Sequence, residues 1–281
     1  MGLTHNFLAM QEVEQKLVYH DLNKAVLWDL HTIITKKTIE DKDVGRFRGD
    51  EDEIIVGDTR SDMVYHIPPS EKFMKEEIER LIDYANDNSP KRQFVHPLIK
   101  AIILHFWIGY LHPFTDGNGR MARLIFCWYL LRNNYWAFSY LPISRVIRNS
   151  PAQYRDAYIY TEQDDNDLTY FIDYNIRKIK QAKIEFEKYL KRKEKENQQM
   201  AEISHSEYAL NDRQIQLLRY LHKNPNSTTT IKLHSTIYSL TRITAQKDLE
   251  ELENAGFLSS KKFGRERLFK GLTKIQELFP K

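Results

Sequence analysis

The feature that most restricts the fold is a long apolar stretch over residues 98–111, directly after Pro97. It reads LIKAIILHFWIGYL. Fourteen residues are too many for a typical strand and too few for a helix that crosses a bilayer. We therefore expect a helix buried in the protein core. A second apolar run begins at residue 121, so residues 112–119 are predicted to form a short loop held between two buried helices.

The rest of the chain is also predicted to be mainly helical. Its 281 residues include only ten glycines and nine prolines, too few for a β-rich architecture with many turns. Apolar periodicity predicts helices over residues 13–36, 70–86 and 168–190. Two short β-prone runs, separated by glycine and aspartate, predict a hairpin over about residues 53–67.

Composition excludes several classes of protein. Cys127 is the single cysteine, which excludes a disulfide scaffold or a cysteine-based zinc site and is typical of a reducing compartment. The chain has no run of eighteen apolar residues, and its first residues lack a signal-peptide core. We therefore expect a cytoplasmic protein without a membrane anchor.

The C-terminal part of the chain follows another pattern. Helices are expected over residues 211–222, 229–235 and 241–254, followed by a two-stranded ribbon near residues 263–265. This order resembles a winged helix-turn-helix module and implies a small α+β domain at 207–281. Residues 191–206, rich in charge, are interpreted as a helix end or linker. From residue 204 onward the chain holds 13 Lys and Arg against 8 Asp and Glu, although its overall net charge is only +3.

The winged-helix resemblance implies a nucleic-acid function for this module. Such modules usually bind DNA through the third helix, while the wing contacts phosphates. The side chains available for this are Arg242, Thr244, Gln246, Lys247, Lys261, Lys262, Arg265 and Arg267. The alternative is a module that only mediates protein contacts or dimerisation, because Glu250, Glu251 and Glu253 dilute the positive charge of the third helix.

The loop between the two core helices carries the chemistry. Residues 112–123 read HPFTDGNGRMAR. A glycine-flanked stretch that leads into an apolar helix presents free backbone N–H groups at the positive end of the helix dipole, and so predicts an anion-binding cradle. Arg120 and Arg123 lie one helical turn apart, so both guanidinium groups are expected to reach a polyphosphate above this helix.

Two further side chains of the loop complete a reactive set. Asp116 is the nearest carboxylate and is suited to hold Mg²⁺ beside a polyphosphate. His112 titrates near neutrality and is suited to take a proton from an attacking hydroxyl. Other interpretations fit less well: a dinucleotide fingerprint must follow a strand, and a Walker loop ends in Gly-Lys-Ser/Thr. A simple turn explains the glycines and Asn118, but not the charged residues together.

The same residues carry a resemblance to a known family. The loop matches H-x-F-x-[D/E]-G-N-G-R-x-x-R, the signature of the Fic domain family, at all eight specified positions. Residues 44–48 and the His-Ile-Pro-Pro segment at 66–69 also look like parts of this family. The resemblance covers about residues 17–190. It implies a Fic-type helical bundle, a catalytic domain at 1–190, and a hairpin that acts as a flap over the active site.

The resemblance also implies an activity. Fic enzymes mostly transfer AMP from ATP to a hydroxyl of a protein side chain, a reaction called AMPylation. The resemblance makes His112 the general base for a Ser, Thr or Tyr hydroxyl and Asp116 the Mg²⁺ ligand. Gly117, Asn118 and Gly119 would form the anion hole, Arg120 and Arg123 would clamp the triphosphate, and Phe114 would anchor the loop in the core. Tyr154 and Tyr158 are candidates either for packing on the adenine ring or for ordinary core packing.

Partners and regulation follow from the same resemblance. The expected partners are ATP, a protein target docked on the hairpin, DNA at the winged helix, and a second copy of the chain. Many relatives carry an inhibitory helix, S/T-x-x-x-E-G/N, whose glutamate pairs with the arginine that corresponds to Arg123. This chain contains no such hexapeptide, so we predict AMP transfer rather than AMP removal. The alternative function is a DNA-binding transcription regulator whose Fic domain acts mainly as a nucleotide sensor.

Overall fold

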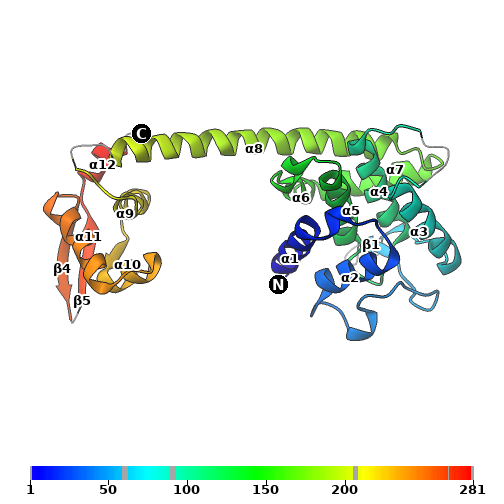
Figure 1. The fold of residues 1–281 in the computed structure, drawn as a ribbon, viewed down its shortest axis with the longest axis horizontal. Helices are drawn as coiled ribbons and strands as arrows, with labels where there is room; N and C mark the ends of the chain where they lie inside the picture. The colour runs from blue at the N-terminus through cyan, green and yellow to red at the C-terminus, as the bar shows by residue number, and fades with distance from the viewer. Residues whose placement is uncertain (1, 59–62, 89–92, 205–207, 265, 280–281) are drawn as a thin grey trace. The chain divides into compact units, whose positions relative to one another are not determined.

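The structure is a computed structural model that describes residues 2–58, 63–88, 93–204, 208–264 and 266–279 (Figure 1). The chain forms two compact units, Met1–Glu187 and Lys188–Lys281. The fold is mainly helical with two small sheets, as predicted. Within the described ranges, no helix combines the length and the apolar character needed to span a bilayer.

Helices make up most of the first unit. They are α1 (Gly2–Gln15), α2 (Lys24–Thr35), α3 (Glu71–Ala85), α4 (Pro97–Leu111), α5 (Asn118–Arg132), α6 (Ile143–Arg148) and α7 (Pro151–Gln163), with short 3₁₀ turns η1 (Leu17–Tyr19), η2 (Asp41–Asp43) and η3 (Trp136–Ser139). The long helix α8 (Thr169–Ser204) begins in this unit and continues into the second. The α4 helix matches the predicted core helix. The α5 helix begins at Asn118, so the loop is shorter than predicted. The charged residues predicted as a helix end or linker continue α8 to Ser204.

The prediction of one helix over residues 13–36 was wrong. The chain breaks between α1 and α2 because Asn23 caps the new helix, its side chain accepting a 3.0 Å hydrogen bond from the Val26 N–H. The preceding residue, Leu22, is tied to α3 through the side chain of Asn86, which accepts from the Leu22 N–H at 2.8 Å and donates to the Leu22 carbonyl at 2.7 Å. These contacts interrupt the helical conformation between α1 and α2.

The core of the first unit lies where α4 and α5 pack against each other. Both helices bury most of their side chains, and α2, α3, α7 and α8 contribute one face each. Trp128 of α5 and Phe171 of α8 are among the largest fully buried side chains. The loop from 112 to 117 is therefore attached at both ends to the most buried helices of the unit.

The predicted hairpin is present. Strands β1 (Val56–Asp58) and β2 (Met63–His66) pair in an antiparallel manner, with Val56 opposite His66 and Asp58 opposite Met63. The first strand starts at Val56 rather than at Glu53. Residues 59–62, between the two strands, lie outside the described residues. The end of β2 brings His66 next to the C-terminal turn of α4, where it contacts the Tyr110 carbonyl.

The second unit contains helices and a three-stranded sheet. Its elements are α9 (Asp212–Lys223), β3 (Thr228–Thr230), α10 (Ile231–Tyr238), α11 (Arg242–Asn254), β4 (Leu258–Phe263), β5 (Glu266–Gly271) and α12 (Ile275–Leu278). Strand β5 lies in the centre and pairs in an antiparallel manner with both β3 and β4. The three helices α9, α10 and α11 were predicted, whereas β3 and α12 were not predicted. The second helix starts later than predicted because residues 228–230 form a strand and Thr230 caps α10.

Candidate functional site

A cavity of about 580 Å³ lies in the first unit, beside the loop of residues 112–117. Its walls come from the hairpin, the last turn of α4, the first turn of α5, and α7. His112 and Gly119 line it from the loop side, whereas His66, Tyr158 and Glu162 line it from the hairpin and α7. This volume lies within the range usual for small-molecule pockets and is large enough for a nucleotide.

The loop has a fixed shape that its own residues set. His112 and Gly117 both adopt the left-handed conformation, with φ of 43° and 84°. The side chain of Asn118 is buried and binds the Phe114 backbone twice, accepting from its N–H at 3.0 Å and donating to its carbonyl at 2.7 Å. Phe114 is fully buried, as predicted. The Asn118 side chain is therefore used to hold the loop and is not available to a ligand.

His31 of α2 holds the loop, although no sequence motif pointed to this residue. Its Nε2–H donates to the Asp116 carbonyl at 2.9 Å, and its Nδ1 accepts from the Gly45 N–H at 3.0 Å. The ring stacks on Phe114 with 3.9 Å between centroids. Burial lowers the pKa of His31, which keeps the ring neutral. His31 therefore fixes the loop through three separate contacts.

Arg48 holds the loop at its other end. Its Nε donates to the His112 carbonyl at 2.7 Å, and its Nη2 donates to the carbonyls of Leu111 at 3.2 Å and Pro69 at 2.5 Å. The Arg48 N–H also donates to the Pro113 carbonyl at 2.9 Å. A cation at the C-terminal end of a helix interacts favourably with the helix dipole. The buried guanidinium thus joins the end of α4 to the segment that follows the hairpin.

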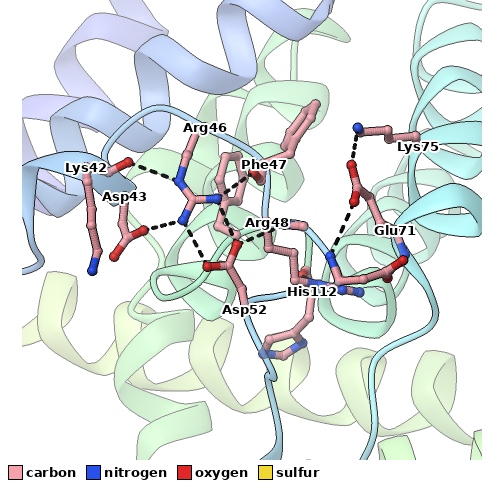
Figure 2. Close-up of polar contacts among 12 residues, drawn as sticks. Lys42, Asp43, Arg46, Phe47, Arg48, Asp52, Glu71, Lys75 and His112 are labelled. Carbon is pink, nitrogen blue, oxygen red and sulfur yellow. Dashed lines mark hydrogen bonds and ion pairs between the residues drawn. The ribbon is translucent and has the colours of Figure 1, made fainter.

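A neighbouring cluster positions Arg48. Figure 2 shows Arg46 between Asp43 and Asp52, next to Arg48. Arg46 binds Asp52 at 2.8 Å and Asp43 at 2.5 Å. The hydrogen bonds from Arg46 lower the pKa of Asp52 to about 2. Residues 43–52 therefore fold around the Arg46 side chain, and this fold presents Arg48 to the loop.

His112 has the geometry of a neutral base. Its Nδ1–H donates to the Gly109 carbonyl at 2.5 Å, which leaves Nε2 as the ring atom with a free lone pair. Burial lowers the pKa of His112 to about 4, although the hydrogen bond to Gly109 raises it; charges on His66 and Arg48 lower it further. At neutral pH the ring is therefore uncharged and able to accept a proton at Nε2.

The backbone N–H groups predicted to form an anion cradle lie at the N-terminus of α5. The N–H groups of Gly117, Asn118 and Gly119 make no hydrogen bond with any residue that the structure describes. Of the three, only Gly119 is exposed and lines the cavity, whereas Gly117 and Asn118 are buried. The structure thus brings Gly119 together with His112 around one cavity.

The two arginines of the loop have different surroundings. Arg120 forms an ion pair with Asp116, with 3.0 Å between Nη2 and Oδ2, and donates to the Ile34 carbonyl at 2.5 Å. Arg123 makes no hydrogen bond or ion pair within the described part of the chain. Its Nη1 lies 3.5 Å from the place that a methyl group on Gly119 would take. Arg123 is thus the unpaired cation beside the cradle.

The side chain of Asp116 fits a magnesium ion bound mainly by other groups. Its carboxylate is 60% exposed, and Arg120 occupies only one of its oxygens. Within the described residues, no group of three or more His, Cys, Asp or Glu side chains could hold a metal ion. Mg²⁺ commonly takes one or two protein carboxylates and completes its shell with phosphate oxygens and water. A single exposed carboxylate is compatible with that pattern.

Tyr154 and Tyr158 both pack in the core and line the cavity. Tyr158 lies 5.1 Å from Phe106 and 4.6 Å from Phe171, measured between ring centroids. The Tyr154 hydroxyl lies 3.0 Å from His105 Nε2. Burial raises the pKa of both tyrosines. Their rings are therefore fixed in place and present part of their surface to the cavity.

Comparison with known proteins agrees with this geometry. Residues 21–130 match the Fic/DOC family. Protein adenylyltransferase fic-1 of Caenorhabditis elegans is 33% identical over 93 residues, which are 32% of this chain and 18% of that protein. Protein adenylyltransferase Fic of Drosophila willistoni is 32% identical over 111 residues, 37% of this chain and 22% of that protein. The chain thus matches about a fifth of the length of these relatives.

Two solved structures share the fold. A Fic family protein from Desulfovibrio desulfuricans G20 has a TM-score of 0.56 and 20% identity, with 97% of this chain and 74% of that chain covered. Fic-1 of Caenorhabditis elegans has a TM-score of 0.51 and 20% identity, with 69% and 52% covered. At this identity the likeness concerns the fold alone. The sequence match at residues 21–130 and the shared fold together show that this chain contains a Fic/DOC family domain.

Proposed function

We propose that the Fic/DOC domain is a protein adenylyltransferase. It would transfer AMP from ATP to a Ser, Thr or Tyr hydroxyl of a target protein or of the chain itself. The observation that carries this proposal is His112: its Nδ1 is used by the Gly109 carbonyl, its Nε2 is free, and it shares a cavity with Gly119. The names of the relatives support the same class of reaction.

The proposed reaction is an in-line displacement at the α-phosphorus. The target hydroxyl oxygen forms a bond to that phosphorus while Nε2 of His112 takes the hydroxyl proton. The bond to the bridging oxygen breaks, and pyrophosphate leaves. Because burial lowers the pKa of His112 to about 4, the ring is already neutral at pH 7. The Gly119 N–H and the dipole of α5 would stabilise the charge on the phosphoryl oxygens.

The charged residues of the loop would hold the rest of the nucleotide. Arg123 is unpaired beside Gly119 and would bind the phosphates there. Arg120 would also bind the phosphates once its ion pair with Asp116 is broken. Asp116 would hold Mg²⁺, which supplies positive charge next to the phosphate oxygens. In this assignment the loop residues bind and orient ATP, and His112 alone moves a proton.

The hairpin would receive the target protein. Its large apolar side chains point to solvent: those of Ile55, Met63, Val64 and Ile67 are all exposed. An exposed strand edge can bind an extended peptide through backbone hydrogen bonds. The hairpin also lines the cavity through Val56 and His66. A peptide on this edge would therefore present a hydroxyl close to His112.

The proposal is tested by labelling with ATP and Mg²⁺. The full chain is incubated with a cell lysate and ATP that is labelled on either the α- or the γ-phosphate. We expect protein label from the α-labelled nucleotide alone. His112→Ala should lower labelling at least about 100-fold, the contribution usual for a general base, with an unchanged circular dichroism spectrum. His20→Ala, at an exposed position, is the matched control.

The same experiment separates the two functions considered for this domain. ATP binding without any transfer of label would support a nucleotide sensor and contradict the adenylyltransferase. Retained labelling by His112→Ala would contradict the role of His112. If the chain instead removed AMP efficiently from a protein that already carries it, and transferred none, that result would contradict the proposed direction of the reaction.

We further propose that the second unit is a winged helix-turn-helix module that binds DNA. The order α9, β3, α10, α11, β4, β5 and the sheet order β3-β5-β4 support this proposal. The basic charge of this part of the chain supports a polyanionic partner. Arg242, Lys261 and Lys262 form no hydrogen bond or ion pair with an acidic side chain in the described part of this unit, and they are the cations that we assign to DNA phosphates.

A further inference from the structure

The ring of His66, at the end of β2, is hydrogen-bonded at both nitrogens. Its Nε2–H donates to the Tyr110 carbonyl at 2.7 Å, and its Nδ1–H donates to Oε2 of Glu162 at 2.8 Å. A backbone carbonyl and a carboxylate only accept hydrogen bonds. Both ring nitrogens must therefore carry protons, so the hydrogen-bond pattern describes a positively charged ring paired with Glu162.

This charged pair lies next to the base. The ring centroids of His66 and His112 are 5.9 Å apart, and both residues line the cavity together with Glu162. The carbonyl that His66 binds belongs to Tyr110, the neighbour of Gly109, whose carbonyl holds the His112 ring. The pair thus contacts the last turn of α4, from which His112 projects.

We propose that Glu162 and His66 act as positioning residues for His112. Glu162 accepts the second hydrogen bond of the His66 ring, and the charge on the doubly hydrogen-bonded ring disfavours a proton on His112. The second N–H of His66 fixes the carbonyl end of α4 that orients the base. The pair thereby keeps His112 in the form that accepts a proton. This inference rests on the proposed function, in which His112 is the base.

Other charged groups near His66 belong to different contacts. Arg155 of α7 is bound to Asp156 and lies over the ring of Tyr65, with 4.9 Å to its centroid. Arg48 lies on the loop side of His112 and donates to its carbonyl. Tyr110 contributes its carbonyl and has its ring 5.4 Å from that of His66. Glu162 is therefore the acidic group that contacts His66 among the described residues.

A purely structural role is the competing explanation. The pair joins the hairpin to α7, and the contact between Tyr65 and Arg155 does the same one residue earlier in β2. If the pair only held the hairpin, its loss would resemble the loss of the Tyr65 contact. It would change stability and binding, but not the protonation of His112. Tyr65→Leu removes the neighbouring contact without changing the charge and is therefore the matched control.

The first experiment observes the histidine rings directly and needs no enzymatic activity. Ring ¹⁵N signals of the full chain are followed by NMR from pH 4 to pH 8. Because both nitrogens of His66 donate hydrogen bonds, we expect two ring N–H signals for His66 in the unchanged protein and one in Glu162→Gln. The titration midpoint of His112 should rise by about one pH unit in Glu162→Gln and at least as much in His66→Asn, because a nearby positive charge is lost. Tyr65→Leu should change neither the ring protons of His66 nor the titration midpoint of His112.

The second experiment measures AMP transfer across the same pH range. In Glu162→Gln the acid limb of kcat/KM should move to higher pH by as much as the His112 midpoint rises. In Glu162→Asp, which keeps the carboxylate, this limb should move less. Tyr65→Leu should lower the rate without moving the limb. A singly protonated His66 in the unchanged protein, or an unchanged His112 midpoint in Glu162→Gln, would overturn the inference. An unchanged protein that transfers no AMP refutes the proposed function instead, and NMR then decides this inference alone.

Discussion

The two glycines that flank Asn118 have different physical tasks. Gly117 has φ of +84°, and a methyl group there would lie 2.9 Å from Cγ2 of Thr35. Gly119 lies in the first turn of α5, and a methyl group there would meet only Nη1 of Arg123, at 3.5 Å. Gly117 is therefore needed for the path of the backbone. Gly119 is needed because its surface faces the cavity.

Alanine substitutions separate these two tasks. Gly117→Ala should lower the free energy of unfolding by about 1–2 kcal/mol, because an L-residue is strained in this conformation. Gly119→Ala should leave stability unchanged or raise it by up to about 1 kcal/mol, as alanine is favoured within helices, but should weaken ATP binding. Urea unfolding and calorimetric titration with ATP measure the two effects. Equal losses of stability in both variants would contradict the distinction.

At this scale the sequence could predict only those site residues that lie close together along the chain. His112, Asp116 and Arg123 were recognisable because a single short loop contains them all. His31 and Arg48 contact residues 85 and 64 positions away, so their roles depend on tertiary packing that one sequence does not display. His66 was noticed only as part of a resemblance, and its partner Glu162 carried no signal.

Short polar networks decide how the elements around the loop meet. The loop rests on α2 through His31 and on the segment before the hairpin through Arg48. Arg48 satisfies several carbonyls in a buried place, whereas Arg46 is partly exposed and binds two carboxylates. Removing a buried donor leaves its acceptors without partners, which costs more than the loss of an exposed ion pair.

Matched substitutions test this difference. Arg48→Met should lower the free energy of unfolding by about 2–4 kcal/mol, because the carbonyls at the end of α4 lose their donor. Arg46→Met should cost about 1 kcal/mol, because its ion pairs are partly exposed to water. Urea unfolding followed by tryptophan fluorescence gives both values. A larger loss for Arg46→Met would show that the cluster, rather than Arg48, holds the loop.

In the second unit, ion pairs restrict which side chains can contact DNA. Arg267 binds Glu253 at 2.5 Å and lies 3.4 Å from Glu250, so its charge is already balanced. Gln246 donates to Glu250 at 2.9 Å, and Thr244 lies 2.9 Å from Thr241, hydroxyl to hydroxyl. Arg265 lies outside the described residues. The predicted interface is therefore less positive than the sequence alone indicated.

This restriction gives a quantitative expectation for DNA binding. About three phosphate contacts, from Arg242, Lys261 and Lys262, predict a slope of about −3 for log K against log salt. Replacing both Lys261 and Lys262 by alanine should reduce this slope to about −1, and Arg267→Ala should leave it nearly unchanged. Fluorescence anisotropy of the full chain with duplex DNA at several salt concentrations measures the slope. An absence of binding at low salt would contradict a DNA-binding role.

The elements themselves were predicted where local signals are strong. The uniform apolar run gave α4, and the glycine and aspartate between β-prone runs gave the hairpin. The break between α1 and α2 was missed because it depends on contacts of Leu22 with Asn86, far along the chain. Strand β3 was missed because it has only three residues, all threonine, and is paired by the distant β5.

For the whole molecule, buried neutral histidines couple folding to pH. Burial lowers the pKa of His31, brings that of His105 to about 3 and brings that of His112 to about 4. In the unfolded chain these rings titrate near pH 6.5. Between pH 6.5 and 4 the unfolded state therefore binds more protons than the folded state. Stability must fall as the pH decreases through this range.

The shifts of His105 and His112 should accordingly lower the unfolding free energy of the first unit by about 4 kcal/mol between pH 7 and pH 5. All four tryptophans of the chain lie in this unit, so urea unfolding followed by tryptophan fluorescence reports on it. His112→Ala removes one of the three rings and should reduce the pH dependence. His20→Ala, at an exposed position, should leave this pH dependence unchanged. A first unit that is equally stable at both pH values would show that these rings are protonated when folded.

The ion pair between Asp116 and Arg120 has a further consequence for ligand binding. Each side chain neutralises the other in this ion pair. In the proposed reaction, a cation that binds Asp116 releases Arg120 for an anion, and an anion that binds Arg120 releases Asp116 for a cation. The two ligands should therefore raise each other's affinity by the same factor, as thermodynamic reciprocity requires. The loop would then select the metal–nucleotide complex over either component alone.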